Sequence, residues 1–278
     1  MFFNDMKKLI IAVVLATFIG CNGSRQRSSV AVNDSLPGYP APQDINEDSE
    51  ILEISGTKKN IPDIVKAIIN KDPAVLSQLT AFPIKRVYPL KSIETPEQLG
   101  EYFDTLFDDA FIEELKKSSL DDWHCAGWRG YSYGNGKLWV YDYLVGITYS
   151  SAKEQALLRK LIDIDKESTS LDMEKWTPCD CFTEVSGAFL VRLDKSEEDM
   201  FRLSIFNRGT PLSAMPDVIM YGTETIEGSM ANRFFEFSSE DKKSSISFIL
   251  CAYDDSDISL EWNRNNKIEE YLIKPKRD

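Results

Sequence analysis

The chain has 278 residues and a formal net charge of −13 at pH 7, and 42% of its residues are hydrophobic. A chain of this length can form one large domain or two small ones. Nucleic acids and anionic lipid headgroups are bound through clustered Lys and Arg side chains, so the acidic charge excludes both as expected partners.

The N-terminus resembles the export signal of a bacterial lipoprotein. MKK at residues 6–8 precedes the apolar run LIIAVVLATFI at residues 9–19, which is too short for a membrane-spanning helix at this place in a chain. The run ends at Gly20 and Cys21. This ending is similar to the lipobox, in which a small residue precedes the cysteine that receives the lipid. A plain signal peptide with an incidental cysteine is the alternative.

The lipobox implies a signal peptide at residues 1–20 and a lipid-modified Cys21 that carries palmitate among its acyl chains. Stable anchoring requires more than one acyl chain and needs no spanning helix. We therefore expect a lipid-anchored protein of the bacterial cell envelope, held at the outer membrane and facing the periplasm. Its expected partners are the membrane, through this anchor, and an unidentified protein or small-molecule ligand.

Residues 21–59 are expected to form a flexible tether. The segment is rich in Ser, Asn, Pro and acidic residues and has no sustained hydrophobic period, so it cannot bury enough surface to fold alone. Within it, ILEIS at residues 51–55 alternates like a β-strand and is a candidate to pair with the folded body.

Helical patterns dominate residues 60–178, the first expected domain. Isoleucine and valine residues spaced by three and four predict a helix over residues 60–80, with Pro62 near its start. Thr95 is the predicted N-cap of a second helix, and Ser151 begins a capping-box pattern ahead of a third.

Between these helices, residues 121–143 have the composition of strands that are broken by glycine. The tripeptide Gly134-Asn135-Gly136 separates two aromatic runs and predicts a hairpin, because Asn and Gly adopt positive φ at low cost. On the second strand, Trp139 and its alternate neighbours are expected to point to one face and Val140 to the other. We expect the helices to pack on the resulting antiparallel sheet.

Short apolar segments recur across residues 179–278, the second expected domain. They are FLVRL, FRLSIF, DVIMY, RFFEF, ISFIL, ISLEW and EEYLI. A spacing of about eight to twelve residues, with turn residues between the segments, predicts an antiparallel barrel or sandwich. The whole chain is therefore expected to be α+β, with an all-β second domain.

The first domain resembles a known family. Its helices, the stretch YPLKSIETPEQLGEYFDTLFDDAFIEEL and the hairpin around GNGKLWV are similar to the NTF2-like cone, in which helices pack into the concave face of a curved antiparallel sheet. The strands FLVRLD, FRLSIFN and NRFFEF resemble the small β domain that follows this cone in uncharacterised periplasmic lipoproteins. The resemblance implies this two-domain fold and no particular reaction, because members of one fold differ in function.

His124, the only histidine, is the first candidate for catalysis. It follows Asp121 and Asp122, and no G-x-S-x-G nucleophile motif accompanies it, so we expect a peripheral position and assign no catalytic residue. The acidic run at residues 254–257 lacks the glycine turn and terminal glutamate of an EF-hand loop. No metal site and no cofactor are expected.

Four cysteines follow the lipobox: Cys125, Cys179, Cys181 and Cys251. An oxidising compartment favours disulfides, and Cys179 and Cys181 are too close in sequence to pair easily with one another. The predicted disulfide joins Cys125 to Cys179 or Cys181 and so links the two domains. Cys251 is then a buried thiol or the partner of the remaining cysteine. A metal site built from the C-x-C pair, Cys125 and its neighbouring histidine is the alternative.

Trp128, Tyr131, Trp139 and Tyr141 are the candidate ligand-pocket residues. Rings of this size usually fill the core of a small curved sheet. The alternative is that they line the open mouth of the cone, where apolar walls with a few polar groups form a ligand pocket.

The sequence predicts a non-enzymatic binding or interaction protein, because it contains no recognisable nucleophile motif, cofactor loop or metal motif. The alternative is an envelope hydrolase that uses acidic residues gathered in the cone pocket.

Overall fold

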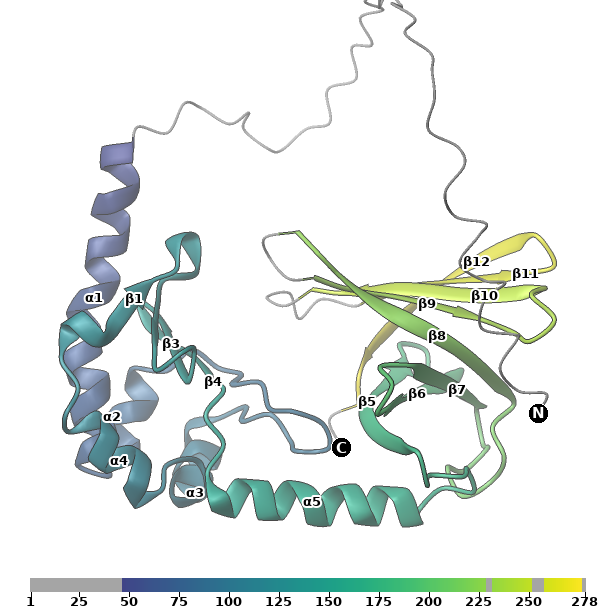
Figure 1. The fold of residues 1–278 in the computed structure, drawn as a ribbon, viewed down its shortest axis with the longest axis horizontal. Coiled ribbons are helices and arrows are strands. Elements are labelled where there is room, and N and C mark those ends of the chain that lie inside the picture. Colours follow the sequence, from purple (N-terminus) through teal and green to yellow (C-terminus); the bar gives the residue numbers. More distant parts are fainter. Residues whose placement is uncertain (1–46, 229–231, 252–257, 277–278) are drawn as a thin grey trace, which may run out of the picture. The chain divides into compact units, whose positions relative to one another are not determined.

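The computed structural model describes residues 47–228, 232–251 and 258–276, and all of them fall within one structural unit (Figure 1). The first part of this unit contains helices and a four-stranded antiparallel sheet, and the second part is a closed antiparallel barrel. The predicted α+β class is confirmed. Of the barrel and the sandwich predicted for the second part, the structure has the barrel. The expected signal peptide, Cys21 and the acidic run at residues 254–257 lie outside the described residues.

The described helices are α1 (Glu47–Ile69), α2 (Pro73–Gln78), α3 (Pro96–Leu106), α4 (Asp109–Leu115) and α5 (Ala152–Glu167), with the short 3-10 helices η1 (Leu120–Asp122) and η2 (Gly127–Arg129). Four of the described α-helices, α2 to α5, begin at polar N-cap residues. The Thr95 hydroxyl accepts a hydrogen bond from the Gln98 N–H, and the Ser151 hydroxyl accepts one from the Glu154 N–H. Both predicted N-caps are therefore confirmed.

Helix α1 begins at Glu47 and includes residues 47–59, which the sequence assigned to the tether. The strand predicted for residues 51–55 is wrong, because these residues are helical. Apolar residues at 51, 54, 61, 64 and 68 are spaced by three, seven, three and four, which is the spacing of one helix face. The five residues 51–55 also alternate like a strand, so this short segment alone did not distinguish the two structures. Because α1 begins at Glu47, Pro62 lies inside the helix and not near its start.

The four-stranded sheet is a simple meander. Its strands are β1 (Trp123–Cys125), β2 (Tyr131–Tyr133), β3 (Leu138–Tyr141) and β4 (Tyr143–Ile147), paired in that order. The predicted hairpin joins β2 to β3, and Gly134, Asn135 and Gly136 all have positive φ there. Helix α1 contacts β3 and β4, so that Val140, Leu144 and Ile147 are buried on the helical side of the sheet. Aromatic rings from Phe103 to Phe111 extend this core.

The outer edge of β4 is covered by the chain that follows α2. Thr80 forms a parallel bridge with Leu144, the Ala81 N–H donates to the Leu144 carbonyl at 2.9 Å, and the Leu144 N–H donates to the Leu79 carbonyl at 2.8 Å. The backbone of β4 is therefore paired on both sides over these residues.

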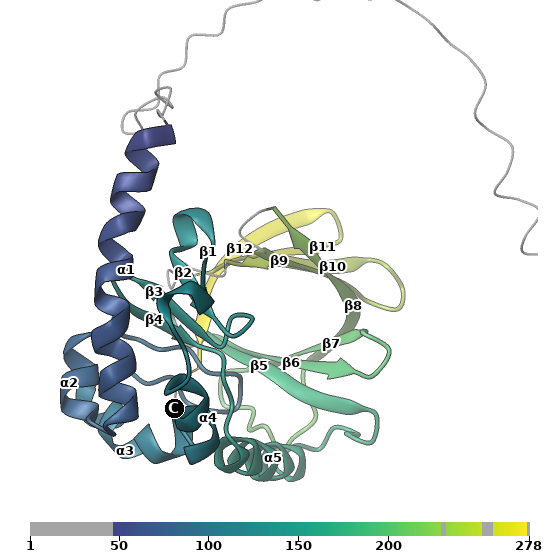
Figure 2. The same ribbon diagram turned by 60° about the vertical axis from the view of Figure 1, so that its left-hand side comes forward.

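The barrel is an up-and-down meander whose last strand pairs with its first, as the ring of strands in Figure 2 shows. Its strands are β5 (Trp176–Glu184), β6 (Phe189–Ser196), β7 (Phe201–Asn207), β8 (Val218–Glu227), β9 (Asn232–Ser238), β10 (Ser244–Leu250), β11 (Ile258–Arg264) and β12 (Lys267–Pro275). Inward-facing side chains alternate with outward-facing ones along each strand and fill the barrel with aliphatic and aromatic groups. The interior is consequently a packed core.

Helix α5 joins the two parts and contacts both α3 and β5. After it, Leu171 and Met173 form a small buried cluster with Phe206 on the outer wall of the barrel. Among the helices that the structure describes, none has the length and hydrophobicity that spanning a bilayer requires.

Candidate functional site

Of the four aromatic candidates for a ligand pocket, the three whose side chains are described do not come together on one face of the sheet. Tyr131 pairs with Val140 in the sheet register and is buried in the helical core. Trp139 alternates with Val140 along β3 and so faces the other side, as does Tyr141, whose side chain is 44% exposed. The side chain of Trp128 lies outside the described residues.

His124 lies on β1 and is exposed, as expected. It borders an open groove with Glu113, Glu114 and Asp122. The Asp122 carboxylate accepts hydrogen bonds from the Ser119 N–H and hydroxyl, so it serves the local turn. Within the described ranges, no three His, Cys, Asp or Glu residues are grouped closely enough to hold a metal ion.

The predicted disulfide is not present, because all four cysteines of the described chain are free thiols. Cys125 is exposed on the edge strand β1, whereas Cys181 is buried on the outer wall of the barrel. Cys179 packs against the barrel core and Cys251 follows β10. The connection between the two parts is made by other side chains.

A cavity of about 430 Å³ lies between the loop of residues 85–92, helix α5 and one end of the barrel, and we call it the α5 cavity. Leu161 and Ile164 contribute apolar groups from α5. Leu250 and Ile258 contribute others from the ends of β10 and β11, and both also pack against the barrel core. The walls of the α5 cavity therefore combine aliphatic groups with polar and charged ones.

More basic than acidic side chains line the α5 cavity. The charged lining residues are Lys85, Arg86, Lys91, Lys276, Asp165 and Asp180. Both carboxylates are paired with arginines of the barrel strands. Within the described part of the chain, Lys91 and Lys276 have no ion-pair partner. The cavity thus carries a local positive charge in a chain whose net charge is −13.

Arg86 holds the loop of residues 85–92 against α5. Its Nε donates a hydrogen bond to Oε1 of Glu154 at 2.8 Å, and its Nη2 donates to the other oxygen of the same carboxylate. The guanidinium also donates to the carbonyl oxygens of Ile147 and Tyr149. Both charged side chains are almost fully buried, so this bidentate pair fixes the position of one cavity wall.

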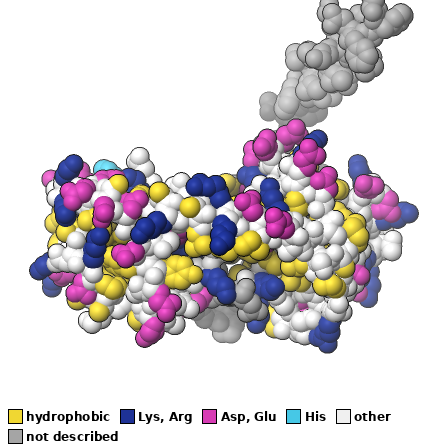
Figure 3. Space-filling model, turned by 90° about the horizontal axis from the view of Figure 1, so that it is seen from below, with side chains coloured by type: hydrophobic (Ala, Val, Ile, Leu, Met, Phe, Trp, Pro, Cys, Tyr) yellow, Lys and Arg dark blue, Asp and Glu magenta, His cyan; other side chains and the backbone are white. Residues whose placement is uncertain are grey.

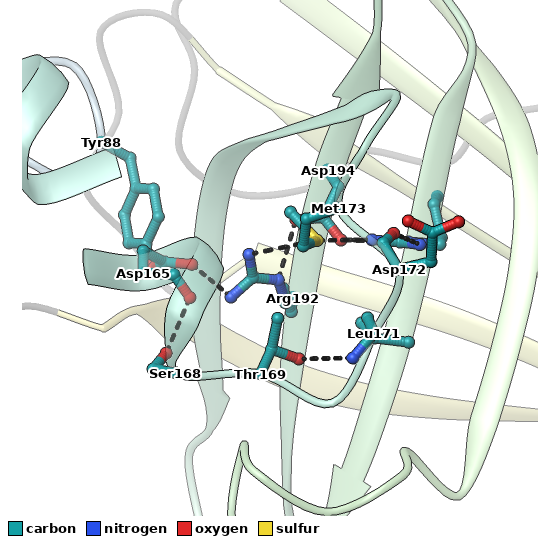
Figure 4. A network of polar contacts seen from close by, with 10 residues as sticks. Tyr88, Asp165, Ser168, Thr169, Leu171, Asp172, Met173, Arg192 and Asp194 are labelled. Carbon is teal, nitrogen blue, oxygen red and sulfur yellow. Dashed lines mark hydrogen bonds and ion pairs between the residues drawn. The ribbon is translucent and has the colours of Figure 1, made fainter. Parts of the chain in front are cut away.

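A second buried network lies behind Tyr88 and Asp165, two residues that line the α5 cavity (Figure 4). The Tyr88 hydroxyl donates to Oδ2 of Asp165 at 2.6 Å, and Oδ1 of Asp165 forms an ion pair at 2.5 Å with Nη1 of Arg192, without the alignment of a hydrogen bond. Arg192 donates from Nε to Oδ1 of Asp194 at 2.8 Å, and Arg202 donates from Nη2 to Oδ2 at 2.9 Å. The network joins the loop, α5 and the barrel wall.

The environment of the network keeps its titratable neighbours neutral. Burial raises the pKa of Tyr88 far above its ordinary value, with a further contribution from the nearby Cys181 and Asp165. Burial also raises the pKa of Cys181 to about 12. A protonated thiol is a poor nucleophile, and Tyr88 remains a hydrogen-bond donor. These two groups are suited to shaping the cavity and not to attacking a substrate.

At the same end of the barrel, Arg233 lies between two carboxylates. Its Nε donates to Oε1 of Glu224, and its Nη1 lies 3.3 Å from Oδ2 of Asp180. Burial raises the pKa of Asp180 to about 6, although Arg233 opposes this shift. Asp180 is therefore the lining residue whose charge changes nearest to neutral pH.

The α5 cavity could not be predicted from the sequence, because its walls come from segments that are far apart in the chain. One signal was available, since KRVYPLK at residues 85–91 places three basic residues together in an acidic chain. Comparisons with protein-family models, with curated proteins and with solved structures found no match.

Proposed function

We propose that this protein is a lipid-anchored binding protein of the bacterial envelope, and that it holds a small-molecule ligand in the α5 cavity without chemical change. The lipobox-like ending at Cys21 supports the anchor and the compartment. The relation of the first part to the NTF2-like cone is also a proposal, supported by the contacts of α1 with β3, β4 and α4.

The α5 cavity is the observation that carries the binding function. Its volume of about 430 Å³ lies within the range of about 300–1,000 Å³ that small-molecule sites occupy. Such sites combine apolar walls with a few polar groups that orient the ligand. The aliphatic groups of the walls and the two lysines without ion-pair partners among the described residues fit that description.

The carboxylates at the cavity support binding better than hydrolysis. A glycosidase-type site needs two carboxyl groups with direct access to the substrate. Asp165 is held by Tyr88 and Arg192, and Asp180 is held by Arg233, so both are engaged within the protein. Binding is therefore the function that these contacts favour.

Native mass spectrometry tests this proposal on the chain carrying Cys21→Ser, purified without detergent. We expect a bound small molecule in the wild-type cavity. Leu161→Trp places a large ring in the cavity and should remove the bound mass. Asp163→Trp adds the same ring to an exposed position of α5 that does not line the cavity, and should retain it. A chain without any bound mass, or equal retention in both variants, would contradict the proposal.

A further inference from the structure

We propose that the ligand of the α5 cavity is an amphipathic anion, with a carboxylate or phosphate headgroup on an aliphatic chain. This inference rests on the proposed binding function. It names the class of ligand from the charges and the apolar groups that line the cavity.

The headgroup is inferred from two lysines. Lys91 belongs to the loop of residues 85–92, and Lys276 directly follows β12. The Lys276 N–H donates to the Cys181 carbonyl at 2.8 Å, which fixes the backbone of this lysine at the cavity. Among the described residues neither ammonium group has an ion-pair partner, so an anionic ligand would supply the missing opposite charge.

The chain of the ligand is inferred from the aliphatic groups of the walls. Leu161 and Ile164 of α5 face the cavity together with Leu250 and Ile258 of the barrel end. Near the middle of the face drawn in Figure 3, basic side chains in dark blue lie among apolar ones in yellow. Apolar surface gains free energy when an aliphatic chain covers it, whereas a small inorganic anion would leave these walls in contact with water.

The fixed charges around the cavity argue against a cationic ligand. The arginines of the site are already used within the protein, because Arg86 is paired with Glu154 and Arg192 with Asp165. The lining carboxylates are likewise engaged, because Asp165 is held by Tyr88 and Arg192. Asp180 shares Arg233 with Glu224, so a bound cation would have to compete with this arginine and would also meet the two lysines.

The net charge of the chain and the charge of the cavity have opposite signs. A net charge of −13 makes the surface as a whole unsuited to anionic lipid headgroups, as the sequence predicts. The α5 cavity is a local exception, because a ligand there lies next to Lys91 and Lys276, whereas salt screens the more distant acidic charges. A single anion can therefore be held there while an anionic surface is repelled.

Isothermal titration calorimetry with the full chain carrying Cys21→Ser tests this inference. The probes are laurate, dodecyl phosphate, dodecyltrimethylammonium and inorganic phosphate, each below its micelle concentration. We expect laurate or dodecyl phosphate to bind, and the other two to show no binding. Laurate alone would identify a fatty-acid site, whereas dodecyl phosphate alone would identify a site for single-chain lipid phosphates.

The variant Lys91→Ala/Lys276→Ala should weaken binding of the anion by about tenfold or more, which is the effect of losing one charge-assisted contact. The matched control is Lys153→Ala/Lys274→Ala, which removes two lysines that do not line the cavity and should bind as the wild type does. Equal affinity in the two double variants, or tight binding of dodecyltrimethylammonium, overturns the inference. A ligand retained in native mass spectrometry without binding of either alkyl anion overturns the ligand class and leaves the binding function standing.

Discussion

At the scale of single residues, Asp194 is the charge on which the barrel wall depends most. It is fully buried and accepts hydrogen bonds from both Arg192 and Arg202. Two guanidinium groups are thereby buried against one carboxylate, with Asp165 as the second anion on the side of α5. A buried charge is tolerated only while its partner is present.

Asp194→Asn should lower the free energy of unfolding by about 3–5 kcal/mol, because it leaves buried guanidinium charge without its carboxylate. Urea unfolding followed by tryptophan fluorescence measures this loss. The control is Asp199→Asn, which removes an ion pair with Lys195 whose carboxylate is 84% exposed, and it should change stability by less than about 0.5 kcal/mol. Similar losses in both variants would mean that the buried network contributes no more than a surface pair.

Asp180 should give the protein a measurable pH dependence. Its pKa is raised by burial from 3.8 to about 6, so between about pH 4 and pH 6 the folded chain holds a proton that the unfolded chain has released. The contribution of this group to the free energy of unfolding is therefore largest at low pH and falls as the pH rises through that window.

In Asp180→Asn this fall should be absent, because an amide doesn't titrate there. Urea unfolding of both proteins at about pH 4.5 and about pH 7 provides the comparison. The same change in stability between the two pH values for wild type and variant would show that Asp180 is not the group responsible.

At the scale of elements, Pro62 distinguishes a long α1 from a short helix that begins near residue 60. Proline is favourable in the first turn of a helix but costs about 3 kcal/mol in the interior, where its ring and missing N–H disrupt the ladder. Pro62 is exposed, so replacing it removes no buried contact.

Pro62→Ala should therefore raise the free energy of unfolding by about 1–3 kcal/mol and increase the helical signal in circular dichroism. Pro96→Ala is the matched control, because Pro96 is the first residue of α3 and should give no such gain. A Pro62→Ala variant that behaves like the control would favour a helix that starts at Pro62.

Much of the barrel was predictable from alternation alone. The seven apolar segments found in the sequence correspond to strands β6 to β12. Strand β5 was missed, because Trp176–Glu184 contains a proline and two cysteines, and its register shifts between Pro178 and Asp180. A bulge interrupts the period of two on which strand prediction depends.

The candidate site was less predictable than the fold. The predicted alternation of Trp139 with Val140 was correct, and it places Trp139 and Tyr141 on the face away from the helical core, whereas Tyr131 is buried in that core. The α5 cavity depends on side chains from α5, the loop of residues 85–92, strand β5 and the ends of β10, β11 and β12, which only the folded chain brings together. Local sequence patterns contain no information about such distant contacts.

At the scale of the whole molecule, ionic contacts occupy the role that the sequence assigned to a disulfide. The pair of Arg86 with Glu154 holds the loop of residues 85–92 against α5. The ion pair of Asp165 with Arg192 then joins α5 to barrel strand β6. Such contacts do not depend on the redox state of the compartment, although they require that burial persists.

The anchor is tested on the whole protein. If Cys21 carries the lipid, Cys21→Ser should move the protein from the membrane fraction to the soluble envelope fraction, because acylation supplies most of the free energy of membrane binding. Fractionation followed by immunoblotting measures the distribution, and Cys125→Ser, which removes an exposed thiol of the folded part, is the control. Membrane association that persists in Cys21→Ser would rule out this anchor.

The pairing of strand edges has a consequence for self-association. Open strand edges invite other chains to add to a sheet, and a closed barrel has none. In the four-stranded sheet, the edge of β4 is occupied at Leu144 by Thr80 and its neighbours, and the opposite edge is the backbone of β1. That strand has only three residues, Trp123–Cys125, which leaves a second copy little to pair with. Addition of a second copy at the edge of β1 is therefore expected to be unfavourable.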